Sequence, residues 1–142
     1  MAIDERLWGI VGKRLGYSEA ELVEFRADPR NELVLEKAAD LGNSRIVLEV
    51  VESNGCNSRH TVGDRIVFDG AGNLLTSESP GRICAYALPN ALLMVCAANE
   101  MIYQGLDAND VRFRRTQCFD VGLKCGGWGR VVFEMHVERK PE

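Results

Sequence analysis

The sequence lacks several features that would assign it to a functional class directly. The longest apolar stretch, residues 91–98, is much shorter than the roughly 18 residues of a membrane-spanning helix, so no membrane span is expected. Residues 1–6 carry acids where a signal peptide would be basic, and no apolar segment follows, which predicts a cytoplasmic protein. Basic residues are not in excess, because 17 Lys and Arg stand against 21 Asp and Glu, for a formal charge of −4. This balance disfavours a nucleic-acid partner.

Two signatures of cofactor binding are also missing. The glycine-rich segment 122–129 has neither the G-x-G-x-x-G spacing nor the Gly-Lys-Ser/Thr ending of a phosphate-binding loop, and it precedes a predicted strand. Nucleotide binding is therefore not expected. The paired C-x-x-C motifs of a zinc ribbon are absent as well. What remains is a chain of 142 residues, 46% of them hydrophobic, without internal repeats. This is enough for one domain with a proper core.

The first 43 residues are predicted to be helical. Apolar residues recur at helical spacing in a first helix: Leu7, Trp8, Ile10, Val11 and Leu15. Gly16 ends that helix, and Ser18 with Glu21 forms a capping box that opens a second helix, which Pro29 ends. A third helix is predicted from about 31 to 41. We expect segment 1–43 to act as a lid, a small subdomain, or an arm that binds a protein partner or a second copy of the chain.

Residues 44–142 show the alternation of strands. Strands are predicted at about 46–51, 65–69, 111–114 and 131–137, with a short one near 74–75. One long helix is predicted from Pro89 to Gln104, and Cys96 in its apolar centre is expected in the core. The predicted fold class is α+β: a helical N-terminal segment (1–43), then a domain (44–142) with an antiparallel sheet of about four strands and one long packed helix.

Most of the cysteines fall where the chain leaves regular structure. Cys56 and His60 share a polar loop, Cys84 precedes the long helix, and Cys118 and Cys125 flank the glycine-rich turn. In a reducing compartment such cysteines are free thiols, metal ligands or redox groups. Zinc and iron prefer thiolate and imidazole ligands. The pattern predicts a zinc or iron site formed by Cys56, His60, Cys84 and Cys118, with Cys125 in reserve.

A metal-free alternative uses the same residues. Cys118 or Cys56 beside His60 would form a nucleophile and base acting on a small-molecule substrate. Either Asp120 or Asp64 could orient the imidazole, and Asp120 could also move protons. Trp128 is expected to be either a hydrophobic plug or a wall for a flat substrate. His136 lies on the outward side of the last strand and is predicted to be a surface residue.

The stretch from Ile46 to Val137 resembles a small family of uncharacterised prokaryotic proteins. The matching residues are Cys56 with His60-Thr61-Val62-Gly63-Asp64, then Cys84-Ala85-Tyr86, then Cys118-Phe119-Asp120. The resemblance implies that Cys56, His60, Cys84, Cys118 and Asp120 belong to one set, and it implies no activity. Three functions follow as hypotheses. The first is a metal-binding protein that is a small metabolic enzyme or a subunit of a larger one. The second is a metal-free cysteine enzyme, and the third is a structural interaction module.

Overall fold

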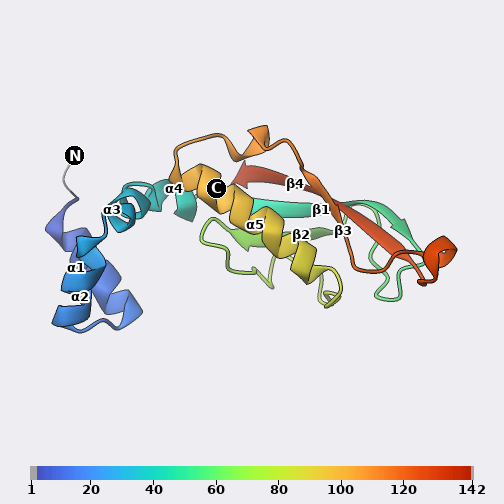
Figure 1. Ribbon diagram of the computed structural model, residues 1–142, viewed down its shortest axis with the longest axis horizontal. Coiled ribbons are helices and arrows are strands. Elements are labelled where there is room, and N and C mark those ends of the chain that lie inside the picture. The colour runs from blue at the N-terminus through green and yellow to red at the C-terminus, as the bar shows by residue number, and fades with distance from the viewer. Residues whose placement is uncertain (1–2, 142) are drawn as a thin grey trace. The chain divides into compact units, whose positions relative to one another are not determined.

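The computed structural model describes residues 3–141 and divides the chain into two compact units. One unit ends at Ala39 and the other begins at Asp40 (Figure 1). This boundary falls within the short helix α4 (Ala38–Gly42), whereas the sequence placed it after Asn43.

The N-terminal unit is helical, as predicted. Its three complete helices are α1 (Glu5–Leu15), α2 (Glu19–Ala27) and α3 (Pro29–Glu36). Both hydrogen bonds of the Ser18–Glu21 capping box are present, so the predicted start of α2 is confirmed. Trp8 packs edge-on against Phe25, with 6.0 Å between ring centroids. The third helix does not continue to residue 41, because Lys37 ends α3 and α4 starts anew.

The second unit contains a four-stranded antiparallel sheet in the order β2-β1-β4-β3, which confirms the α+β class. The strands are β1 (Ser44–Asn54), β2 (Arg65–Asp69), β3 (Arg115–Gln117) and β4 (Arg130–Arg139). Helix α5 (Leu88–Tyr103) lies across one face of the sheet (Figure 1). Two short 3-10 helices, η1 (Ala108–Asp110) and η2 (Leu123–Cys125), complete the unit.

The core lies between the sheet and α5. Leu48 of the central strand β1 is paired with Ile66 of β2 on one side and with Met135 of β4 on the other. All three side chains are fully buried. Because side chains alternate between the two faces of a strand, this register stacks apolar residues on one face. Residues of α5 are buried at helical spacing: Ala91, Val95, Ala98 and Ile102.

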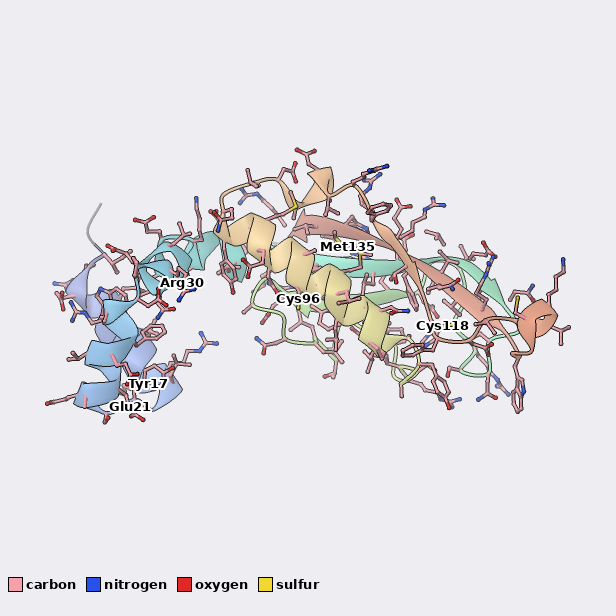
Figure 2. All side chains as sticks on the ribbon, in the orientation of Figure 1. Tyr17, Glu21, Arg30, Cys96, Cys118 and Met135 are labelled. Atoms are coloured by element: carbon pink, nitrogen blue, oxygen red, sulfur yellow. The ribbon has the colours of Figure 1, made fainter. Side chains whose placement is uncertain are left out.

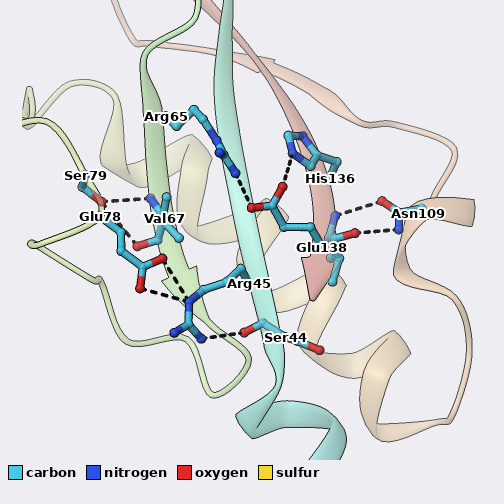
Figure 3. Close-up of polar contacts among 10 residues, drawn as sticks. Ser44, Arg45, Arg65, Val67, Glu78, Ser79, Asn109, His136 and Glu138 are labelled. Carbon is cyan, nitrogen blue, oxygen red and sulfur yellow. Dashed lines mark hydrogen bonds and ion pairs between the residues drawn. The ribbon is translucent and has the colours of Figure 1, made fainter. Parts of the chain in front are cut away.

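Polar contacts tie neighbouring loops to the sheet (Figure 3). The buried Arg45 pairs with Glu78 of the loop beside β2, with Nε 3.1 Å from Oε2. At the other edge, the Asn109 side chain exchanges two hydrogen bonds of 2.9 Å with the backbone of Val137.

Two predictions about this unit were wrong. The strand expected at 111–114 begins later, because pairing with β4 starts where Met135 N donates to Arg114 O. Cys96, expected in the core, is exposed on α5 (Figure 2), beside the exposed Leu92 and Leu93. The helix is apolar on more than the one face that meets the sheet, so composition alone misplaced Cys96. Within residues 3–141, no helix is both long enough and apolar enough to cross a membrane.

Candidate functional site

The pairing of the strands brings the distant cysteine-bearing loops to one end of the sheet. The end of β1 meets the start of β4, since Asn54 is paired with Arg130. The end of β3 also meets the start of β4, since Gln117 is paired with Val132. The Asn90 side chain of α5 donates to Gln117 O at 2.6 Å and fixes the start of the helix there. Antiparallel register therefore determines which loops converge.

A cavity of about 460 Å³ lies between these loops. Four of the residues that the sequence singled out line it: Cys56, His60, Cys84 and Cys118. Asp120 and Trp128 line it too, whereas Cys125 is exposed on η2 outside the lining. His136, predicted to be a surface residue, is half-buried on β4 and contacts Glu138. A cavity of this size suits a small molecule.

Cys118 is held at the base of β4. Its backbone N–H donates to Val131 O at 3.0 Å, and Val131 N–H donates to its sulfur at 3.4 Å. The side chain is buried, at 8% exposure. The pKa of the Arg130 guanidinium is raised, first by its hydrogen bond to Glu52 and to a smaller extent by charge on Cys118. The Cys118 sulfur therefore accepts an N–H donor, and the Arg130 guanidinium lies within electrostatic reach of it.

His60 is buried at 4% exposure, and its two ring nitrogens have different surroundings. Nδ1 lies 3.6 Å from Asp64 Oδ2, an ion-pair distance that is long for a hydrogen bond. Thr61 N–H donates to the same carboxylate oxygen at 2.9 Å and fixes it. Nε2 is buried and has no hydrogen-bond partner in the described part of the chain. Of the two carboxylates considered from sequence, Asp64 is thus the one placed against the imidazole.

Asp120 holds the glycine-rich loop. Its carboxylate accepts N–H groups from Gly122, Trp128 and Gly129, each at 3.0 Å. These donors, led by Gly129, lower the pKa of Asp120 below its ordinary value. A Cβ added to Gly127 would lie 2.0 Å from Oδ1, so only glycine fits beside the carboxylate. Because the oxygens of the Asp120 carboxylate accept backbone N–H groups, this side chain positions the glycine-rich loop.

The loop that carries Cys56 and His60 is pressed against the glycine-rich loop. A Cβ added to Gly129 would lie 2.2 Å from Gly55 O. Gly55 itself has a φ of +62°, where other residues are strained. Between the cysteine and the histidine, Arg59 adopts the same left-handed region, with a φ of 59°. Such strained backbone is often found at functional sites.

The sulfur and nitrogen atoms that could bind a metal line one cavity, but they do not form a preformed metal site. Across residues 3–141, no group of three or more His, Cys, Asp or Glu side chains is placed to hold one ion. Sequence reasoning also missed Tyr86, Phe119 and Arg130, which line the cavity. Two of them could have been found from their position in the sequence, because Tyr86 lies two residues after Cys84 and Phe119 directly follows Cys118.

Comparison with known proteins gives no further guidance. No family model, no curated protein and no solved structure matches this chain. The family resemblance drawn from short motifs stays a prediction.

Proposed function

We propose that the cavity binds a small electrophilic molecule and that Cys118 reacts with it. The observation that carries the proposal is that Cys118 and a buried, partly unpaired His60 line one cavity of small-molecule size. His60 takes the role of proton acceptor, and Asp64 orients the imidazole. The protein is taken to be cytoplasmic, where its five cysteines, all free in the structure, would stay reduced.

The roles are assigned from the chemistry of the groups that line the cavity. Among residues 3–141, His60 Nε2 has no hydrogen-bond partner, so the proposed step requires the imidazole and the Cys118 side chain to approach each other. The Cys118 thiol then gives its proton to Nε2. The sulfur then attacks an electrophilic carbon and forms an S–C bond, while the displaced electron pair leaves with the leaving group. Asp64 beside Nδ1 stabilises the imidazolium that results. The Val131 N–H donates to the sulfur at 3.4 Å and holds it in position for the attack.

Alkylation by iodoacetamide at neutral pH tests the proposal. The rate at each cysteine is measured by mass spectrometry, in the wild-type chain and in His60→Asn. Cys118 is expected to react faster than the exposed Cys96 and Cys125, although it is the most buried of the three. Loss of the imidazole should slow Cys118 at least tenfold, since a general base typically contributes about 10²–10⁴.

The exposed Cys96 is the internal control for this experiment. Its rate should be that of an ordinary thiol and should not change in His60→Asn. If Cys96 and Cys125 react faster than Cys118, accessibility alone governs the chemistry and the proposal is wrong.

Zinc or iron binding is a second candidate, favoured by the chemistry of the donors. Three thiols and an imidazole with an unpaired buried nitrogen line the same cavity: Cys56, Cys84, Cys118 and His60. Their present placement does not fit one ion, so binding would require side chains to move. No reaction step is assigned to a metal.

Elemental analysis of protein purified without oxygen separates the two candidates. About one equivalent of zinc or iron, together with protection of Cys56, Cys84 and Cys118 from alkylation by added Zn²⁺, would favour the metal site. Metal far below one equivalent, with all five thiols titratable, would reject it.

A further inference from the structure

Three exposed aromatic side chains line the cavity that contains Cys118. Tyr86 is 66% exposed, Phe119 61% and Trp128 78%. Leaving such large rings in water gives up the burial that aromatic residues normally contribute. None of the three rings stacks on another aromatic ring within residues 3–141. Their faces are therefore free to contact a ligand.

Backbone hydrogen bonds anchor the segments that carry the three rings. Phe119 N–H donates to Tyr86 O at 2.9 Å, which joins the loop before α5 to the segment after β3. Trp128 N–H donates to the Asp120 carboxylate at 3.0 Å, which places Trp128 beside that segment. The backbone that carries the rings is thus anchored, and binding requires little ordering of it.

Arg130, the basic residue of the lining, offers less for recognition. The guanidinium of Arg130 is already paired with Glu52, so it is not an unpaired cation that would select an acidic ligand. Flat apolar groups, in contrast, stack favourably on aromatic rings.

We propose that the ligand of this cavity carries a flat apolar group, held by Tyr86, Phe119 and Trp128, with its electrophilic carbon beside Cys118. The inference rests on the proposed function and adds the class of substrate. It assigns Trp128 as a wall of the site, the second of the two roles that the sequence left open.

A pair of alkylating reagents tests this inference. Iodoacetamide and N-benzyl iodoacetamide react identically with a thiol: an S–C bond forms, the C–I bond breaks, iodide leaves with the electron pair, and the proton goes to the base. The two reagents differ in the flat group. For each cysteine, the rate with the benzyl reagent is divided by the rate with iodoacetamide.

The ratio at Cys118 is expected to exceed that at Cys96 by roughly tenfold, because a single aromatic contact is worth roughly two- to tenfold in rate or affinity. The variants Trp128→Ala and Phe119→Ala should each lower the ratio by about two- to tenfold. Phe113→Ala is the matched control, because Phe113 is equally exposed, at 72%, and lies outside the cavity lining. It should leave the ratio unchanged.

Three results would overturn the inference. If Cys118 reacts selectively with iodoacetamide but its ratio equals that of Cys96, the site has no preference for flat groups and the proposed function still stands. If the preference exists but survives both Trp128→Ala and Phe119→Ala, the rings do not cause it. If Cys118 reacts no faster than Cys96 with either reagent, the proposed function and the inference are both wrong.

Discussion

Replacing His60 with leucine should make the protein more stable. The imidazole is almost fully buried, and its Nε2 has no hydrogen-bond partner in the described part of the chain. Leaving a buried polar group unpaired costs about 1–3 kcal/mol. Leucine is similar in size to histidine and removes that group. A residue kept at a cost to stability is expected where function requires it.

The gain is reduced by the lost contact with Asp64. That contact is long, at 3.6 Å, and the Asp64 side chain is one-third exposed, so it is worth about 0–1 kcal/mol. The expected net change in His60→Leu is an increase of about 1 kcal/mol in the free energy of unfolding. For a unit of about 100 residues, this raises Tm by about 4–8 °C.

Urea unfolding followed by circular dichroism measures the change. His136→Leu is the control, because His136 is half-buried, contacts Glu138 at 3.4 Å and has no buried unpaired nitrogen. Its effect should stay within about 0.5 kcal/mol. A loss of about 2 kcal/mol or more in His60→Leu would refute the reasoning, because it would mean that Nε2 has a partner in solution, such as ordered water or an ion.

Three further predictions concern the loops around the cavity. N–H groups, first that of Gly129, lower the pKa of Asp120 below its ordinary value of 3.8. The ionised carboxylate therefore stabilises the loop fully at a pH above 3.8, and this stabilisation is lost as the pH falls through the lowered pKa of the folded protein. Hydrogen exchange at the Trp128 amide should show this loss in acid, and Asp120→Asn should show it already at neutral pH. Gly127→Ala should lower the free energy of unfolding by about 1–3 kcal/mol, because its Cβ would lie 2.0 Å from the Asp120 carboxylate. Gly81→Ala is the control, because no atom lies within 4 Å of the added Cβ, and urea unfolding should show almost no change in its stability. Arg59→Gly should raise the free energy of unfolding by up to about 1 kcal/mol, because it relieves a left-handed backbone, and a decrease in that assay would contradict this explanation.

Much of the local structure could be predicted because local physics decides it. The capping box at Ser18 and Glu21 depends on side chains three residues apart, and both of its hydrogen bonds form. The alternation from Val131 to Met135 buries the same side of β4 that the sequence indicated. The predictions that failed depended on contacts with distant segments. Pairing with β4 decides where β3 begins, and packing of α5 on the sheet decides that Cys96 faces outward.

The sequence by itself determined the types of chemical group at the site and the loops that carry them. It could not decide which loops meet, because that depends on the register between β1 and β4, where Asn54 lies opposite Arg130. The structure also decided between the two carboxylates that the sequence left open, because Asp64 lies against His60 whereas Asp120 binds the backbone of its own loop. The physical reason is that periodicity and capping act over a few residues, whereas the cavity joins residues that strand pairing brings together from more than sixty positions apart, as with Cys56 and Cys118.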